Sequence, residues 1–557
     1  METRNVFLAI VLSMAIIFGY QYFFVPPPAP QTRETVQVPA DSSALPAAVP
    51  VLTAAGAVPV GQVAAALPLN AAPARPALEI PVENGLYAAT ISESGGVIKK
   101  FRLKNYRENL AAESVGMELI KEGAGRDLPL FFSWGTDPTR VSELPLYEAA
   151  PAVRNSDGTV TLTMTGRLPS GLVVTRTMTF QSGNYLIDLN VEVANTSTSA
   201  LQGAPYLSLV GHPFVANPKA GQSQFKGPAI FKDGKREEVK IKTLAEDGPK
   251  TIQGKISWTA YEDTYFMMAV APAGNDAANP VTVRLTSEGG TSVGNVLSGP
   301  AEVINPGASR HYSYTVFFGP KRMADLNAAG HDFNQAVNFG WFGIVAHPLL
   351  VLMIWIHKIV GNYGVAVILV TVLIKLIFWP ITHKGMKSMK GMQKLQPKLA
   401  ELREKYKGDK ERMAQEQMNL YKTYKINPLG GCLPMVIQIP VFFALYQVLM
   451  QAIELRHAPF MFWITDLSAP ERLAIGFDIP YLGGLPVLTL LMGATMFLQQ
   501  KMTPTPAANP ETAKIMMFMP VIFTFMFINF ASGLVLYFFV NNLLQMAQQY
   551  FINRSED

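Results

Sequence analysis

Hydrophobic and polar positions follow three patterns along this chain. Residues 6–25 form an uncharged, largely apolar run, long enough to cross a hydrocarbon layer of about 30 Å. Residues 78–320 alternate between apolar and polar positions, and the chain from about residue 335 is again apolar, with helical spacing. These patterns predict a membrane anchor, a β-domain and a helical membrane region, in that order.

The N-terminal run has two interpretations. A cleaved signal peptide usually has a shorter apolar core and a small-residue cleavage site, whereas three prolines follow this run directly. We therefore expect residues 1–25 to be an uncleaved anchor with its N-terminus in the cytoplasm. Residues 26–77 contain 26 Ala or Pro among 52 positions, so we expect a disordered, extended tether there.

The alternation is clearest at 185–193, where Tyr185, Ile187 and Leu189 are separated by polar residues. Similar runs occur elsewhere in this region, and no helical segments of about 10–15 residues lie between them, which disfavours an α/β fold. We expect residues 78–320 to form a large antiparallel β-sandwich (supersandwich) domain outside the cytoplasm. The other predicted strands are 160–165, 172–180, 281–286 and 312–318.

The C-terminal region predicts one interfacial helix and five membrane spans. Residues 335–360 combine apolar positions with His347, His357 and two tryptophans, which is typical of an amphipathic helix lying in the membrane interface. Residues 361–380 and 430–551 then form a five-span helical core, and the anchor makes six spans in total. The predicted spans of the core are 363–379, 432–451, 481–497, 515–530 and 533–550.

Two connections between these spans differ in charge. Residues 381–428 carry 12 Lys or Arg against 5 Asp or Glu, while residues 452–480 carry two against four. The positive-inside rule therefore places the first connection in the cytoplasm and the second outside, with both termini cytoplasmic.

The basic connection also has its own apolar pattern. Methionines and leucines recur every three or four residues, which predicts a cytoplasmic helical hairpin over 381–428 with a kink or restart at Pro397 and a break at Gly408. The apolar stripe either packs between the two helices or offers a soft surface to hydrophobic proteins. Both interpretations stay open at this point.

Composition narrows the function further. Charged residues make up 16% of the chain, below the usual ~25%, and 49% are hydrophobic, which indicates a membrane protein. A net charge of +5 gives no reason to expect nucleic-acid binding, and a single cysteine excludes a disulfide framework. Protease, hydrolase and nucleotide-binding motifs are missing from the sequence, so we expect neither an enzyme nor a cofactor or metal site.

One charged residue, Lys375, lies inside a predicted span, one turn after Thr371. A charge in hydrocarbon costs about 2.5 kcal/mol or more, so Lys375 either faces a polar cavity or extends its side chain to the nearby interface. The other four core spans also carry polar side chains, which together indicate a shared hydrophilic chamber. These are Gln438, Gln447, Thr489, Thr524, Asn529, Asn541, Asn542 and Gln545.

Four sequence strings carry a resemblance to a known family. They are NPLGGCLP at 427–434, QIPVF at 438–442, FMPVIFT at 518–524 and SGLVLY at 532–537. In these strings, and in the order of anchor, tether, β-domain and spans, the chain resembles the YidC/Oxa/Alb family of membrane protein insertases, Gram-negative type.

The resemblance implies a function and partners. Such proteins insert and fold nascent inner-membrane proteins through a hydrophilic groove open to cytoplasm and lipid, alone or with the Sec translocon and without ATP. It implies a bacterial inner-membrane location with the β-domain in the periplasm, and membrane lipids as partners, while the basic hairpin suggests transient contact with the ribosome. Lys375 stands where the family usually has arginine, and Phe538 where it often has a second tyrosine. The implied groove residues are Thr371, Lys375, Gln438, Phe442, Thr524, Tyr537, Phe538 and Gln545.

Two other classes of protein remain open. A transporter or channel would also carry polar residues in its spans, but it should show an internal repeat, and none is visible between spans 2–3 and 5–6. A membrane-tethered glycan enzyme would place its chemistry in the β-domain, where His212 and His311 lie. Paired carboxylates in a β-domain cleft would support that alternative.

Overall fold

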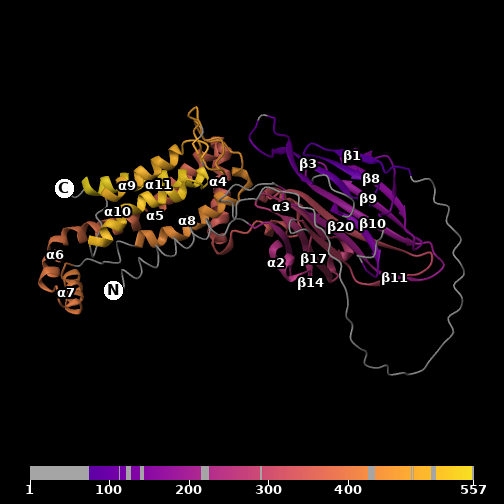
Figure 1. Cartoon of the computed structure of the whole chain (residues 1–557), viewed down its shortest axis with the longest axis horizontal. Helices are drawn as coiled ribbons and strands as arrows, with labels where there is room; N and C mark the ends of the chain where they lie inside the picture. Colours follow the sequence, from indigo (N-terminus) through magenta and orange to yellow (C-terminus); the bar gives the residue numbers. More distant parts are fainter. Residues whose placement is uncertain are drawn as a thin grey trace, which may run out of the picture. The chain divides into compact units, whose positions relative to one another are not determined.

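The computed structural model describes residues 75–111, 113–120, 127–137, 144–214, 225–288, 292–424, 433–477, 479–480, 482–502 and 510–554. The predicted anchor over 1–25, most of the predicted tether over 26–77 and the cysteine at position 432 lie outside the described residues. The described chain forms a β-domain followed by a helical region (Figure 1).

The β-domain is built from three antiparallel sheets of four, ten and six strands, counted over the described residues. Strand β15 of the ten-stranded sheet packs on β11 and β18 of the six-stranded sheet, which makes a sandwich and confirms the predicted antiparallel fold. The strands are β1 Glu79–Glu83, β2 Tyr87–Ser92, β3 Ile98–Arg107, β4 Gly116–Ile120, β5 Phe131–Gly135, β6 Tyr147–Ala149, β7 Val153–Arg154, β8 Val160–Arg167, β9 Leu172–Phe180, β10 Leu186–Asn195, β11 Leu201–Gly211, β12 Gly227–Lys232, β13 Lys235–Glu238, β14 Lys250–Gly254, β15 Ile256–Glu262, β16 Phe266–Pro272, β17 Val281–Glu288, β18 Ser292–Ser298, β19 Glu302–Ile304 and β20 Ser309–Pro320.

The alternating run at 185–193 forms β10, which pairs with β9 on one side and β20 on the other. Its apolar positions Ile187, Leu189 and Val191 are buried, and its polar positions lie on the opposite face. The strand prediction at this position is confirmed, because a sandwich buries one face of each sheet and leaves period-two alternation in the sequence.

A short segment after the last strand also belongs to the β-domain. The ring of Phe333 packs 5.7 Å from Phe317, and Trp258 Nε1 donates to the Asp332 carbonyl at 3.1 Å. The β-domain therefore continues past the predicted limit at Pro320 and includes the short helices α3 Met323–Ala329 and η3 Phe333–Ala336, besides α2 Ile241–Asp247 and η2 Gly274–Ala278.

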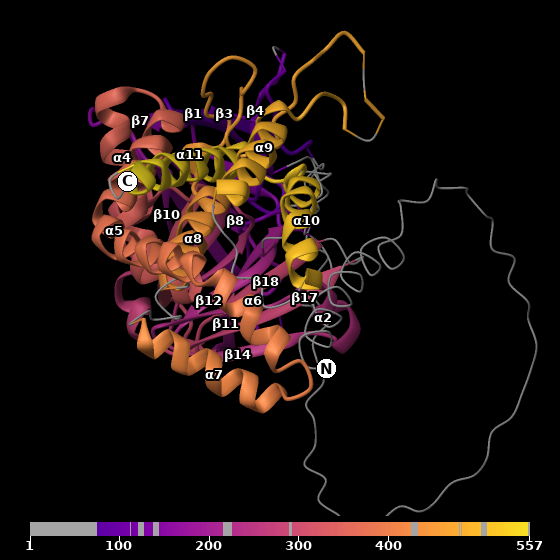
Figure 2. The same cartoon turned by 90° about the vertical axis from the view of Figure 1, so that its left-hand side faces the viewer.

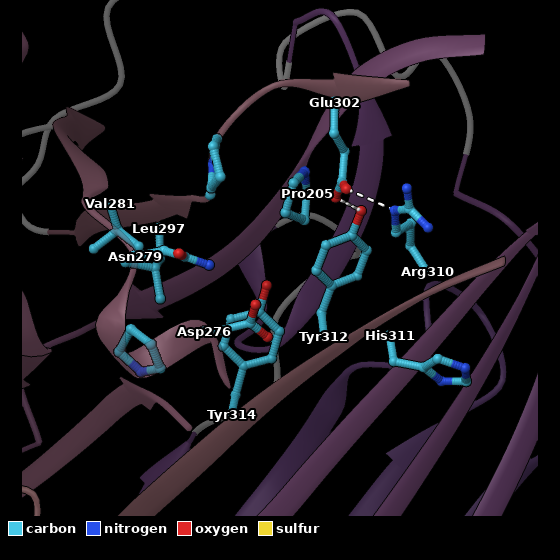
Figure 3. Close-up of a pocket in the computed structure, with 13 residues that line it drawn as sticks. Pro205, Asp276, Asn279, Val281, Leu297, Glu302, Arg310, His311, Tyr312 and Tyr314 are labelled. Atoms are coloured by element: carbon cyan, nitrogen blue, oxygen red, sulfur yellow. Dashed lines mark hydrogen bonds and ion pairs between the residues drawn. The ribbon is translucent and has the colours of Figure 1, made fainter. Parts of the chain in front are cut away.

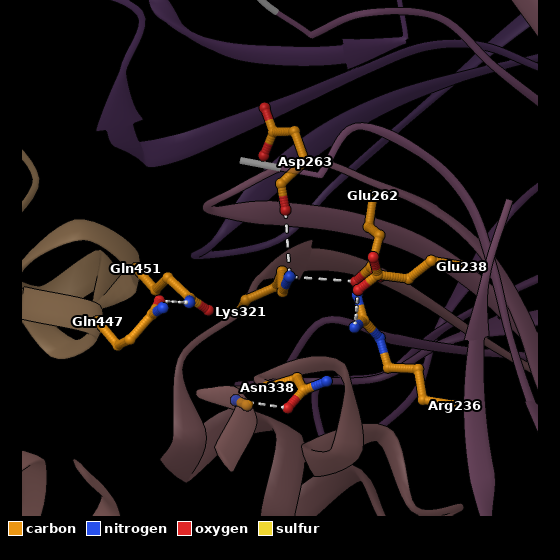
Figure 4. Close-up of polar contacts among 9 residues, drawn as sticks. Arg236, Glu238, Glu262, Asp263, Lys321, Asn338, Gln447 and Gln451 are labelled. Carbon is orange, nitrogen blue, oxygen red and sulfur yellow. Dashed lines mark hydrogen bonds and ion pairs between the residues drawn. The ribbon is translucent and has the colours of Figure 1, made fainter. Parts of the chain in front are cut away.

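A buried ion cluster lies where β20 leaves its sheet (Figure 4). Glu262, which has 0% of its surface exposed, forms ion pairs with Arg236 and, at 3.1 Å, with Lys321. Lys321 Nζ also donates to the Asp263 carbonyl at 3.1 Å, and Arg236 pairs with the more exposed Glu238. Two cations thus compensate one carboxylate that has lost all its water.

The helical region contains eight α-helices among the described residues. Helix α11 packs on α5 and α9, α10 packs on α9, and α4 packs on α5 and α8 (Figure 2). Two segments, 340–360 and 363–394, are long and apolar enough to cross a membrane by composition alone. The helices are α4 Gly343–Val360, α5 Tyr363–Lys394, α6 Gln396–Lys405, α7 Lys410–Thr423, α8 Leu433–Gln451, α9 Val487–Met502, α10 Pro510–Phe527 and α11 Ser532–Arg554; the short turns η4 Gly340–Phe342 and η6 Ile453–Leu455 accompany them.

Local sequence explains where α4 ends and α5 begins. Gly361 takes a left-handed conformation with φ of 69° after α4, and the Asn362 side chain accepts from Val365 N at 3.0 Å. Helix α5 then differs from expectation, because it does not end near Pro380 but continues to Lys394. A proline removes a single backbone hydrogen bond, and the helical conformation continues on both sides of Pro380.

The predicted span at 481–497 begins later than expected. Leu473 and Leu485 exchange backbone hydrogen bonds of 2.9 Å, and Gly483 has a φ of 74°, so the chain before Val487 is extended and turned. Helix α9 therefore starts only at Val487 and has 16 residues.

The predicted hairpin is present as α6 and α7. Helix α6 restarts at Gln396 with Pro397 in its first turn, as expected, and Asp409 caps α7 by accepting from Arg412 N at 3.0 Å. A small buried cluster joins the two helices, which confirms the packing interpretation for this part of the apolar stripe. It consists of Met392, Leu395, Leu399 and Tyr421.

Candidate functional site

A cavity of about 770 Å³ lies among helices α5, α8, α9, α10 and α11. Aromatic and methionine side chains form most of its wall, and a few polar groups interrupt them. The lining residues are Lys375, Thr382, Met386, Met389, Gln438, Ile439, Phe442, Phe443, Tyr446, Met492, Met496, Gln499, Phe523, Met526, Phe527, Phe530, Tyr537, Phe538, Asn541 and Gln545.

Lys375 is the cation of this cavity. Its side chain is 8% exposed, and its Nζ donates to Gln545 Oε1 on α11 at 2.5 Å. The following residues Leu376 and Ile377 are exposed on the outside of α5, so Lys375 points to the opposite, inner side. Among the described residues no carboxylate forms an ion pair with Lys375, which leaves its charge balanced by an amide oxygen only.

Helices α8 and α11 form a part of the cavity wall in which a hydrogen bond lies beside packed rings. Gln438 Nε2 on α8 donates to the Tyr537 hydroxyl on α11 at 2.5 Å. Next to this pair, the rings of Phe442 and Phe538 pack with centroids 5.2 Å apart. Phe538 places its ring in this wall and offers no hydroxyl there.

Two of the eight predicted groove residues do not line the cavity. The Thr371 hydroxyl donates to the Val367 carbonyl at 2.7 Å, and the Thr524 hydroxyl donates to the Pro520 carbonyl at the same distance. Both threonines satisfy their hydroxyls within their own helices, four residues back. Thr524 also packs on Gly493 of α9, so its role is in helix contact.

The sequence analysis missed the methionine lining. The signal was present for Met386 and Met389, which belong to the apolar stripe assigned to the hairpin, but α5 carries them to the cavity instead. Methionine side chains are flexible and polarisable, so this wall can adapt to apolar surfaces of different shape. The other methionines that line the cavity are Met492, Met496 and Met526.

A polar network holds the end of the bundle where α10 stops and α11 starts. Arg472 donates to the Ile528 carbonyl at 2.9 Å and to Asn529 Oδ1 at 3.0 Å. Ser532 Oγ donates to the Asp466 carbonyl at 2.7 Å. Ser532 and Gln545 are thirteen residues apart on α11, so this network lies about 20 Å along the helix from the Lys375 pair.

Apolar helices around an inward-facing lysine, in one chain with a large β-sandwich, define a helical membrane protein with a substantial domain outside the membrane. The family described as 60Kd inner membrane protein matches residues 355–557, and the YidC periplasmic domain matches residues 79–352. The chain therefore belongs to the YidC family of membrane protein insertases, which confirms the resemblance found in the sequence, and its β-sandwich is the family's periplasmic domain.

Relatives support this assignment over the whole length. The membrane protein insertase YidC of Syntrophus aciditrophicus is 41% identical, with 99% of each chain covered. That of Geobacter sulfurreducens is 42% identical, covering 100% of this chain and 99% of the other. A crystal structure of an active YidC insertase with its first transmembrane domain resolved is 20% identical over 86% of this chain and 93% of the other, with a TM-score of 0.36.

Proposed function

We propose that this chain inserts nascent inner-membrane proteins by receiving them in the cavity around Lys375. The observation that carries this proposal is a buried cation that lines the cavity and, among the described residues, forms a hydrogen bond only with Gln545. A charge removed from water without a counter-charge attracts any carboxylate that enters the cavity. The first contact of an acidic client segment is therefore with Lys375.

The wall of the cavity also supports passage of the client's hydrophilic segment and release of its apolar helix into lipid. A short hydrophilic segment of a client is costly in lipid, and the few polar side chains of the cavity would shorten the distance that this segment crosses without a hydrogen-bonding partner. The aromatic and methionine side chains of the wall then accept the apolar helix of the client. Burial of that helix in lipid drives its release sideways.

The proposed topology has six spans with both termini in the cytoplasm. The 12-to-5 excess of basic residues over 381–428 supports a cytoplasmic hairpin. Trp341, which is 98% exposed, and the exposed Trp355 support an interfacial position for 335–360, although α4 is also long enough to span. The network of Arg472 and Ser532 would then close the cavity toward the periplasm.

The proposed partners follow from this topology. Nascent inner-membrane proteins and membrane lipids contact the cavity and the outer faces of the helices. The basic excess of the hairpin and its methionine stripe support transient contact with the ribosome. Insertion proceeds alone or beside the Sec translocon, with no cofactor, no enzymatic turnover and no nucleic-acid binding of its own.

Substitution of Lys375 tests the proposal. Lys375→Arg keeps the charge and should retain insertion, whereas Lys375→Leu should insert clients with acidic translocated segments poorly and clients with neutral segments normally. Lys384→Leu is a matched control, because Lys384 lies on the same helix but does not line the cavity. The measurement is protease protection of the translocated segment in vesicles.

Equal insertion of acidic and neutral clients by the Leu variant would contradict the proposal. A second readout is solvent access: Lys375→Cys, in a background with Cys432 replaced by Ser, should react with a membrane-impermeant thiol reagent added from the cytoplasmic side. If the Lys375 side chain only extends along the helix surface to the membrane interface, Lys375→Leu should be harmless or stabilising.

A further inference from the structure

A second cavity lies in the β-domain. It has a volume of about 180 Å³ and opens between β20 of the ten-stranded sheet and strands β11, β18 and β19 of the six-stranded sheet (Figure 3). Helix η2 and the turn after it form one side of the cavity, and three prolines and a glycine form much of the rest. None of its lining residues belongs to the helical region.

One carboxylate in this cavity, that of Glu302, is fixed by two side chains of β20, one of which is itself held by a side chain of β5. Glu302 Oε1 accepts from the Tyr312 hydroxyl at 2.5 Å, and Glu302 Oε2 accepts from Arg310 Nε at 2.9 Å (Figure 3). Trp134 Nε1 in turn donates to the Tyr312 hydroxyl at 2.9 Å. Each carboxylate oxygen keeps a second lone pair, so Glu302 is a positioned acceptor whose charge Arg310 compensates.

A second carboxylate and a tyrosine hydroxyl face the same space. Asp276 Oδ2 accepts from Ser313 N at 3.0 Å, and burial, followed by the nearby charge of Glu302, raises the pKa of Asp276. Tyr314 is only 5% exposed and lines the cavity, yet no described residue forms a hydrogen bond with its hydroxyl. A tyrosine hydroxyl that lines a cavity without a protein partner takes its hydrogen bond from water or from a ligand.

We propose that this cavity binds one neutral sugar unit of a glycan. Carboxylates accept hydrogen bonds from vicinal hydroxyls, the Arg310 guanidinium and the Asn279 amide donate to them, and the tyrosine and proline faces pack on the C–H face of the ring. Two carboxylates against one arginine disfavour an anionic ligand. The pairing of Glu302 with Arg310 leaves only Asp276 to attract a cation.

The size of the cavity supports a small ligand over a peptide. Ligand pockets for drug-sized molecules measure about 300–1,000 Å³, so about 180 Å³ accommodates a single ring. An extended polypeptide binds along an exposed sheet edge or a long groove instead. The β-domain would thus contact saccharide in the periplasm independently of the cavity around Lys375.

Ligand-detected NMR tests this proposal on the full-length chain. The protein is held in a micelle without sugar head groups, and saturation-transfer difference is recorded with methyl glucoside, methyl galactoside and N-acetylglucosamine as probes. We expect at least one probe to bind at millimolar concentration. Tyr314→Phe and Asp276→Asn should each weaken binding roughly five- to tenfold, the effect of one lost or weakened hydrogen bond. Asp233→Asn, in an exposed turn, should leave it unchanged.

Three outcomes would overturn the proposal. The first is no saturation transfer to any probe from folded protein. The second is binding by both variants that is as strong as that of the unsubstituted chain. The third is displacement of the probe by an extended peptide at a lower concentration than the sugars require. Thermal unfolding of each variant confirms that it is folded before binding is compared. Insertion activity is measured on the same preparations, so loss of sugar binding with normal insertion separates this site from the proposed function.

Discussion

Charged side chains that the β-domain has removed from water are the residues where a single substitution is most costly. Glu262 is the clearest case, because it compensates both Arg236 and Lys321. We expect Glu262→Gln to lower the free energy of unfolding of the β-domain by about 3–5 kcal/mol, since Lys321 then loses its carboxylate partner and Arg236 keeps only the more exposed Glu238. Urea unfolding of the full-length chain, followed by the β-sheet circular dichroism signal, measures this difference.

Glu238→Gln is the matched control for that experiment. Glu238 also pairs with Arg236, but its side chain is partly exposed, so its loss should change stability by less than about 1 kcal/mol. If the two variants lose a similar free energy of unfolding, the burial of Glu262 does not make its ion pairs more important for stability than the exposed pair of Glu238.

A second carboxylate makes the stability of the β-domain depend on pH. A hydrogen bond from Arg75, assisted by the backbone amides of Leu78 and Ala149, lowers the pKa of Glu93 to about 2. A pKa below the unfolded value of about 4.3 means that this contribution is present above that pH and is lost as pH falls toward 2. The stability difference between wild type and Glu93→Gln should therefore be largest near pH 7 and shrink between pH 4.3 and 2.

The measurement is the midpoint of urea unfolding of both proteins across that pH range. Glu79→Gln serves as the control, because Glu79 forms an exposed pair with Lys99. A difference that grows on acidification would contradict the assigned sign.

Some of these residues were visible in the sequence and others were not. Lys375 could be singled out from the sequence, because a cation in an apolar span either faces a polar cavity or extends to the membrane interface. Glu262 is an ordinary acid in the sequence, since its partners Arg236 and Lys321 lie far from it along the chain. Thr371 and Thr524 misled the site prediction because a threonine in a helix can bond its own backbone, and sequence does not reveal which partner it takes.

At the scale of elements, the contact between α9 and α10 depends on one glycine. A Cβ atom at Gly493 would lie 2.0 Å from Thr524 Oγ1, which is itself held by the Pro520 carbonyl. We expect Gly493→Ala to destabilise the helical region by about 1–3 kcal/mol, as overpacking does. The thermal midpoint of the full-length chain in micelles measures the loss.

Two further variants separate the contact from a general glycine effect. Gly493→Ala combined with Thr524→Ala removes the opposing hydroxyl and should recover part of the stability. Gly408→Ala adds a Cβ where no atom lies within 4 Å and should be harmless. If the double variant recovers no stability, the loss in Gly493→Ala does not come from contact with Thr524.

Element boundaries were predictable where local chemistry ends a helix, as at Gly361 and Asn362. They were not predictable at Pro380, where a single missing hydrogen bond was outweighed by the packing of α5 on α4 and α11. The late start of α9 depends on backbone pairing between Leu473 and Leu485, which residue pattern alone does not show.

At the scale of the whole molecule, the insertase motifs and the cavity lie in the helical region. We expect a chain that lacks the β-domain to retain insertion. The packing of Phe333 on Phe317 shows that a clean deletion removes residues 79–337 and not only the strands. Complementation of a depletion strain is the measurement, and absence of growth despite a normal level of the shortened protein would refute the expectation.

Helix α5 is continuous, and it carries both Lys375 and the first residues of the segment 381–428 that the sequence assigned to the hairpin. Its 32 residues measure about 48 Å, against about 30 Å for the hydrocarbon layer, so a substantial length projects beyond the bilayer. A turn of one residue, about 100°, would swing Lys375 away from Gln545 and bring a neighbouring apolar side chain inward. The rotational register of α5 therefore decides whether the wall of the cavity carries a positive charge or an apolar side chain.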